Sequence, residues 1–290
     1  MLNGLIASLR RFLRPAPLHV CYVLSLDEDT LYADMLNISA MCVWRIYPSA
    51  RITILTDDQS LPRVQNKLKP ITSTGAKIWT VGKFEGNLRQ RSRFVKTQMR
   101  NALQGDFLYL DADTVPVSRF DALIQSRSTL SAAIDRNRAS PDGSFPSWVV
   151  PDFQRLGWPY PTELYLNTGV LFWKDCHEAH ELGQQWHRNW LHYTTAVDNP
   201  ADQPSFNHSL NMLGFKPEII SDVHNARLGV SPRFADGAVI YHLLSGDERA
   251  NGTFIDLLLD RYRASGKVDF ALIEATAGRG NPWIGERPRV

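Results

Sequence analysis

The sequence of 290 residues is 43% hydrophobic and 21% charged, an ordinary globular composition that supplies enough apolar residues for a sizeable core. Its 32 basic and 30 acidic side chains leave a formal net charge of +2, which argues against a protein built mainly to coat nucleic acid. Three cysteines, none of them in a Cys-x-x-Cys pair, indicate neither a disulfide framework nor a cysteine zinc site. We therefore expect a globular protein of a reducing compartment with no nucleic-acid partner.

The N-terminal segment 1–14 predicts a short basic amphipathic helix. Its large apolar side chains recur at three- and four-residue spacing, three arginines lie off that face, and Pro15 ends the pattern. Such a helix either contacts an anionic membrane surface or packs on the body of the protein. No apolar run reaches the ~18 residues of a spanning helix, and the N-terminal segment lacks the uninterrupted apolar stretch and small-residue cleavage site of a signal peptide, so we expect a cytoplasmic protein. Membrane contact would place it peripherally on the inner face of the membrane.

After this segment, apolar runs of strand length alternate with stretches of helical periodicity. The predicted strands are His19–Leu26, Arg51–Leu55, Lys77–Val81, Phe107–Leu110, Thr129–Ile134, Tyr165–Trp173 and Ala238–Leu244. The predicted helices are Tyr32–Tyr47, Arg91–Leu103, Cys176–Tyr193 and Ala201–Leu213. Residues 136–161 predict a long binding loop and residues 278–290 a surface tail. Carboxylates directly follow several strands, which indicates an α/β fold with an open sheet and a binding crevice at the strands' carboxyl ends.

Asp111 and Asp113 follow an apolar run and lie two residues apart. Because a strand has a side-chain period of two, both carboxylates can point to one face. Two like charges this close repel each other unless a cation lies between them, and carboxylate oxygens suit Mg²⁺ or Mn²⁺. The alternative is a turn in which Asp113 caps a helix or accepts hydrogen bonds from loop N–H groups. We favour a divalent-metal site, because a buried strand precedes the pair.

The run LYLDADTVPV, residues 108–117, resembles the Asp-x-Asp segment of GT-A nucleotide-sugar glycosyltransferases. The surrounding pattern is most similar to the retaining family 8, and the resemblance extends in motif order from about His19 to Gly246. It implies a Rossmann-like GT-A domain with a mixed central sheet flanked by helices. It also implies Mn²⁺ or Mg²⁺ held by Asp111, Asp113 and His242. We divide the chain into the N-terminal helix, a glycosyltransferase domain at 18–262 and a C-terminal extension at 263–290.

The resemblance assigns several side chains to the nucleotide part of a UDP-sugar donor. Asp27 and Glu28 resemble an acidic pair that contacts the nucleoside, and Tyr32 resembles the aromatic residue that follows it. Lys96 resembles a basic residue that reaches the sugar nucleotide, where Asp111 also contributes. These residues form the predicted nucleotide side of the site.

Further residues are assigned to the donor sugar. Asp135 and Asn167 resemble the family's residues that contact this sugar. Asp202 and Gln203 resemble the family's pair at the reacting sugar, and we take these two as the catalytic residues. Asp202 could instead cap a helix, and Asn167 could serve a turn. The family's His-x-x-Gly-x-x-Lys motif is changed here: the lysine that would hold the diphosphate is missing, and Arg249 is the candidate replacement.

Rival interpretations concern other side chains. His177, His180 and His187 share one broad helical face, and we favour a solvated face over a histidine metal site. Trp148, Trp158 and Tyr160, in the long loop, either stack on an acceptor sugar or pack beneath the loop. Likewise, His242 could be a strand histidine with one satisfied hydrogen bond.

The resemblance thus implies a metal-dependent enzyme that transfers a sugar, with retention, from a UDP-sugar to a hydroxyl of a glycan or lipid-linked acceptor. A divalent ion would neutralise the charge that develops on the diphosphate leaving group. The alternatives are a nucleotidyl- or phosphotransferase that uses the same carboxylates, and a catalytically degenerate protein that only binds sugar nucleotides.

Overall fold

The computed structural model describes residues 17–28, 31–136, 142–161, 164–242 and 252–286. The predicted N-terminal helix at 1–14 and the predicted phosphate ligand Arg249 both lie outside these residues. Among the helices in the described ranges, none is long and apolar enough to cross a membrane.

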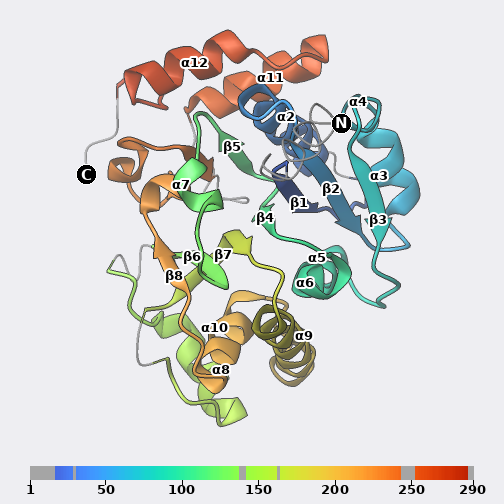
Figure 1. Ribbon diagram of the computed structural model, residues 1–290, viewed down its shortest axis with the longest axis vertical. Coiled ribbons are helices and arrows are strands. Elements are labelled where there is room, and N and C mark those ends of the chain that lie inside the picture. Colours follow the sequence, from blue (N-terminus) through green and yellow to red (C-terminus); the bar gives the residue numbers. More distant parts are fainter. Residues whose placement is uncertain (1–16, 29–30, 137–141, 162–163, 243–251, 287–290) are drawn as a thin grey trace, which may run out of the picture.

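A seven-stranded sheet forms the centre of the molecule, in the order β3-β2-β1-β4-β7-β6-β8 (Figure 1). Its strands are β1 (His19–Val23), β2 (Arg51–Thr56), β3 (Lys77–Thr80), β4 (Phe107–Leu110), β6 (Leu130–Ile134), β7 (Leu166–Trp173) and β8 (Glu218–Ile220). Strand β7 runs antiparallel to both of its neighbours, whereas the β1–β2, β2–β3, β1–β4 and β6–β8 pairs are parallel. The sheet is therefore mixed, and the predicted α/β class is confirmed.

Helices cover both faces of the sheet, and strand alternation decides which core each side chain joins. In β1, Val20 and Tyr22 belong to one apolar cluster, while Cys21 and Val23 belong to the cluster on the opposite face. The first cluster includes side chains of α2 (Leu31–Ile46), α3 (Leu61–Lys67) and α4 (Lys69–Thr72). The second includes those of α5 (Leu88–Thr97), α6 (Met99–Ala102), α9 (His177–Val197) and α10 (Gln203–Met212). Burial on both faces explains why β1 reads as a continuous apolar run.

A second sheet of three short strands lies beside the first, in the order β5-β10-β9. Strand β5 (Thr114–Pro116) pairs antiparallel with β10 (Ile240–His242), which pairs in parallel with β9 (Ala226–Arg227). In this register His242 lies opposite Thr114. The chain therefore leaves the central sheet just after the Asp-x-Asp pair and is held there by a distant strand.

Two sequence predictions of local structure were wrong in part. The predicted helix Arg91–Leu103 begins earlier, where Asn87 forms a capping box with Gln90, and it breaks at Gln98 into α5 and α6. The predicted loop 136–161 contains a 3₁₀ turn, η1 (Ser147–Val149), and helix α8 (Val150–Leu156). A proline in the first turn of α8 and a left-handed glycine after its last residue were the signals in the sequence.

The C-terminal residues pack on the rest of the fold. Helices α11 (Phe254–Ser265) and α12 (Phe270–Arg279) lie beside α2 at one end of the molecule (Figure 1). Ile273 and Trp283 share an apolar cluster with side chains of α2 and the small sheet. The remaining short elements are α7 (Asp121–Ile124), η2 (Asp222–His224) and η3 (Pro232–Ala235). The predicted division at residue 262 falls inside α11, so the helix belongs to both predicted parts.

Because three of its histidines are largely buried, we predict that the protein loses stability on mild acidification. Burial is the chief cause that lowers the pKa of His19, His187 and His208 from 6.5 to about 4. The folded state keeps these rings neutral, while the unfolded chain binds protons below about pH 6.5. Their contribution to stability is therefore full above pH 6.5 and is lost as the pH falls through 4.

We expect the free energy of unfolding in urea to decrease between about pH 7 and pH 4.5. His19 Nε2 bonds to Thr53 Oγ1 at 2.9 Å, and His19→Gln can retain this hydrogen bond while it removes the titrating ring. The variant should show a shallower decrease. A slope equal to that of the unmodified protein would contradict this explanation.

Candidate functional site

The Asp-x-Asp pair lies in a tight turn between β4 and β5. The backbone N–H of Asp111 donates to the carbonyl of Gly169 at 2.8 Å, which fixes the turn to β7. The carbonyl of Asp111 accepts from the Thr114 hydroxyl at 2.8 Å and from the Thr114 backbone N–H at 3.1 Å. Asp113 precedes a strand rather than a helix, so the helix-cap alternative does not apply.

His242 lies against both carboxylates. One potential ligand atom from each of Asp111, Asp113 and His242 lies within 4.8 Å of the others, and no further such group occurs in the described part of the chain. His242 Nε2 is 3.5 Å from Asp113 Oδ1 and 3.8 Å from Asp111 Oδ2. Two carboxylates and one imidazole nitrogen form a donor set that fits Mn²⁺ or Mg²⁺. The three predicted metal ligands are thus brought together.

Gly169 provides the space in which these side chains meet. A Cβ atom added at this position would lie 2.3 Å from His242 Cε1 and 2.9 Å from Asp111 Oδ2. Both distances are below the limit for real contacts, so a side chain here would have to displace the cluster. The glycine is therefore required by the close approach of two side chains.

Two cations from α5 balance the carboxylates. Lys96 is 2% exposed, and its Nζ lies 3.0 Å from Asp111 Oδ1 and 3.3 Å from Asp202 Oδ2. Arg93 Nε lies 2.9 Å from Asp202 Oδ1. Burial alone would raise the pKa of Asp202, but Lys96, Arg93 and a hydrogen bond from Thr168 lower it to about 2. Lys96 was predicted from its motif whereas Arg93 was not, although their three-residue spacing places both on one helical face.

Asp202 occupies the cap position of α10, but its side chain makes no capping hydrogen bond. Its Oδ2 accepts from Thr168 Oγ1 at 2.7 Å, and both of its oxygens face the two cations. The alternative explanation of Asp202 as a simple helix cap is therefore wrong.

The residues predicted to contact the donor sugar form a second group beside the first. Asn167 Nδ2 donates to Asp135 Oδ1 at 3.1 Å and to Gln203 Oε1 at 3.3 Å. Asp135 is 3% exposed and also pairs with Arg227, which no sequence motif indicated. Asn167 belongs to β7, Asp135 follows β6, and Gln203 begins α10. Three elements thus place three polar side chains together.

The predicted nucleoside residues lie at the carboxyl end of β1. Asp27 is half-exposed and pairs with Arg91, whose Nε also lies 3.4 Å from Asp57 Oδ1 at the end of β2. Glu28 is exposed, and Tyr32 packs half-buried against two apolar clusters. Because β1 and β4 are parallel, these residues lie at the same edge of the sheet as Asp111. A role of Asp27, Glu28 and Tyr32 in binding the base stays a prediction.

The rival histidine cluster does not form. His180 Nε2 pairs with Asp175 at 2.7 Å, and His187 Nδ1 bonds to Thr97 Oγ1 at 2.8 Å, so the rings have separate partners. In the long loop, Trp158 stacks on His208 with centroids 3.9 Å apart, which shows a packing role. Tyr160 and Trp148 remain exposed by 40% and 48%.

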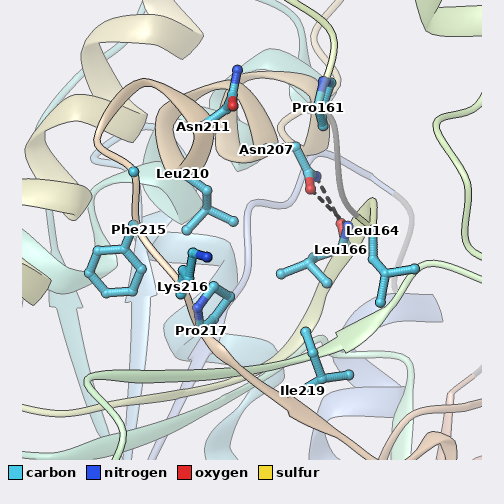
Figure 2. Close-up of a pocket in the computed structure, with 11 residues that line it drawn as sticks. Pro161, Leu164, Leu166, Asn207, Leu210, Asn211, Phe215, Lys216, Pro217 and Ile219 are labelled. Carbon is cyan, nitrogen blue, oxygen red and sulfur yellow. Dashed lines mark hydrogen bonds between the residues drawn. The ribbon is translucent and has the colours of Figure 1, made fainter.

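A cavity of about 280 Å³ lies between the start of β7, α10 and β8 (Figure 2). Figure 2 shows Asn207 hydrogen-bonded to the backbone of Leu166, with Leu164 and Ile219 along the wall. Leu166 lines the cavity and Asn167 follows it, and successive strand side chains point to opposite faces. The cavity is therefore separate from the cluster around Asp111.

The fold is similar to those of solved glycosyltransferases. LgtC, a galactosyltransferase solved with donor and acceptor sugar analogues, matches with a TM-score of 0.52 and 16% identity over 87% of this chain and 96% of its own. An active-site mutant of LgtC gives a TM-score of 0.53 at the same identity and coverage. The apo form of the glycosyltransferase GlyE of Streptococcus pneumoniae TIGR4 gives 0.52 and 15% identity, over 93% of this chain and 65% of GlyE.

No protein-family model matches the sequence, and no curated protein does. At these identities the similarity concerns the fold. The chain has the GT-A glycosyltransferase fold, as the sequence predicted.

Gly169→Ala should disrupt the candidate metal site. The added methyl group overlaps His242, so we expect Mn²⁺ affinity to fall about 10-fold or more and stability to fall by about 1–3 kcal/mol. Calorimetric titration with Mn²⁺ and thermal unfolding measure the two effects.

The matched control is Gly278→Ala, because a Cβ there meets no atom within 4 Å. This helical substitution should leave Mn²⁺ binding intact and stability equal or raised by up to about 1 kcal/mol. Equal Mn²⁺ affinities for the two variants would refute the steric role of Gly169.

Proposed function

We propose that this protein is a metal-dependent glycosyltransferase that transfers a sugar from a UDP-sugar, with retention, to a hydroxyl of a glycan or lipid-linked acceptor. The observation that carries the proposal is the convergence of Asp111, Asp113 and His242 at the carboxyl edge of a GT-A sheet. The solved complex of LgtC with donor and acceptor sugar analogues supports this class of substrates.

The residues suit the departure of a nucleotide diphosphate. When bound by these three ligands, Mn²⁺ or Mg²⁺ would supply a Lewis acid for the developing negative charge. Lys96 and Arg93 add fixed positive charge one helical turn apart, next to the same carboxylates. We also assign Arg249 to binding of the diphosphate. The family's lysine that would do so is missing from the motif that begins at His242, and Arg249 is its candidate replacement.

The polar group around Asn167 suits the donor sugar. Asp135, Asn167 and Gln203 present carboxylate and amide atoms that can bond sugar hydroxyls. Asn167 accepts a hydrogen bond from the Gly169 N–H and so connects this group to His242 and Asp111, which approach the same glycine. Both oxygens of Asp202 are engaged by Lys96, Arg93 and Thr168, so we assign Asp202 to orienting these groups. Gln203 is then the better candidate for stabilising the positive charge that develops on the reacting sugar.

Asp27, Glu28 and Tyr32 are our candidates for the nucleoside. The Arg91 guanidinium pairs with Asp27 and leaves the second carboxylate oxygen of Asp27 to accept a hydrogen bond from a base. Contact of residues 1–14 with the inner face of a membrane remains part of the proposal and would bring the enzyme to a lipid-linked acceptor.

A panel of UDP-sugars with Mn²⁺ tests the function directly. We expect one donor to be hydrolysed or transferred with release of UDP, and the activity to disappear with a chelator. Release of pyrophosphate would instead support a nucleotidyltransferase. Binding of UDP with no turnover for any donor or acceptor would support a degenerate binding protein.

Asp113→Asn tests the metal role. The variant should lose metal-dependent activity, while its melting temperature should equal or exceed that of the unmodified protein, because repulsion between Asp113 and Asp111 is relieved.

Asp121→Asn is the control for charge removal, since Asp121, the first residue of α7, pairs with Arg119 and not with the metal ligands. It should retain full activity. Retained activity in Asp113→Asn would contradict the proposed ligand set.

A further inference from the structure

Asn225 is a buried amide that no sequence motif indicated, and it lies between the metal ligands and the sugar group. Its Oδ1 lies 2.6 Å from His242 Nδ1, and its Nδ2 lies 3.0 Å from Asn167 Oδ1. We propose that Asn225 is a positioning residue that holds His242 in the tautomer able to bind a metal and links that ligand to the donor-sugar residues. The proposal rests on the proposed function for the identity of the two groups.

A backbone donor fixes the direction of every hydrogen bond in this chain of amides. The N–H of Gly169 can only donate, and it reaches Asn167 Oδ1 at 2.8 Å, so that atom of Asn167 is the carbonyl oxygen. Asn225 must then present its NH₂ group to Asn167. Its carbonyl oxygen consequently faces His242 and can only accept.

The proton of a neutral His242 therefore belongs on Nδ1. The lone pair of Nε2 then points towards Asp113 Oδ1 and Asp111 Oδ2, at 3.5 and 3.8 Å. A metal-binding histidine needs this free lone pair, and its other nitrogen commonly donates to a fixed partner.

Without Asn225, the surroundings of His242 favour the opposite tautomer. Two carboxylates face Nε2, and they would attract the ring proton to that nitrogen, where it blocks ligation. A neutral imidazole can carry its proton on either nitrogen, so the choice depends on the partner of Nδ1. Asn225 thus counteracts the carboxylates that share the metal site with His242.

Burial makes the arrangement rigid. Asn225, His242 and Asn167 are each 5% exposed or less. Rotating the Asn225 amide by half a turn would oppose two carbonyl oxygens at Asn167 and two N–H donors at His242, which is costly in a poorly solvated site. Since Asn167 also donates to Asp135 and Gln203, the position of the metal ligand is tied to that of the sugar contacts.

The test compares Asn225→Ala, Asn225→Asp and the buried control Asn189→Ala, whose amide bonds to Ser209 in the contact between α9 and α10. Nitrogen NMR of ¹⁵N-histidine-labelled, metal-free protein reports which ring nitrogen is protonated, and His242→Gln assigns the signal. We expect Nδ1 protonation in the unmodified protein, in Asn225→Asp and in Asn189→Ala. Asn225→Ala should shift the proton to Nε2.

Mn²⁺ titration followed by electron paramagnetic resonance provides the second measurement. Asn225→Ala should weaken Mn²⁺ binding roughly 10- to 100-fold. Asn225→Asp still accepts from Nδ1 but no longer donates to Asn167, so it should recover part of the affinity lost in Asn225→Ala. Asn189→Ala should leave the affinity unchanged.

Nε2 protonation of His242 in the unmodified, metal-free protein would overturn the proposal without recourse to any variant. A folded Asn225→Ala that keeps the Nδ1 tautomer and Mn²⁺ affinity within about twofold would overturn it as well. An unmodified protein with the Nδ1 tautomer but no sugar transfer would refute the proposed function and leave the role of Asn225 standing.

Discussion

The whole site depends on keeping several negative charges together where little water can screen them. Two unit charges about 4 Å apart interact by about 4 kcal/mol at an effective dielectric constant of about 20. Lys96 is inserted between Asp111 and Asp202, and Arg93 covers the other oxygen of Asp202. Burial alone would raise the pKa of Asp111, but Lys96, His242, Arg93 and Tyr109 together lower it. Helix α5 thus supplies the positive charge that lets the carboxylates stay ionised.

The small sheet solves the second problem, which is to bring His242 to residues more than a hundred positions earlier in the chain. After Asp113 the chain leaves the central sheet as β5, and β10 pairs with it so that His242 lies opposite Thr114. Strand β9 adds Arg227, which reaches Asp135. One short set of backbone hydrogen bonds therefore orients both the proposed metal ligands and part of the proposed donor-sugar group.

The central strands could be predicted from the sequence because both faces of the sheet are buried and each strand is an apolar run. Asp111 and Asp113 could be predicted because their chemistry is local: a strand and two carboxylates at a spacing of two. The role of Asn225 could not, because a single asparagine near a 3₁₀ turn carries no signal until the chain places it against His242. Arg93 and Arg227 were missed for the same reason, since an arginine in a polar segment looks like one that faces solvent.

The end of the chain was predicted as a separate extension, and its contacts have a consequence for how the protein can be shortened. The backbone N–H of Phe254 donates to the carbonyl of Pro282, and that of Ile284 donates to Gly252, both at 2.7 Å. Trp283 is 6% exposed in the cluster that α2 shares. A truncation at residue 262 would cut α11, unpair its first residues and expose an apolar face of α2 to water. Such a fragment would be prone to aggregation, so loss of activity after trimming this end would say little about catalysis.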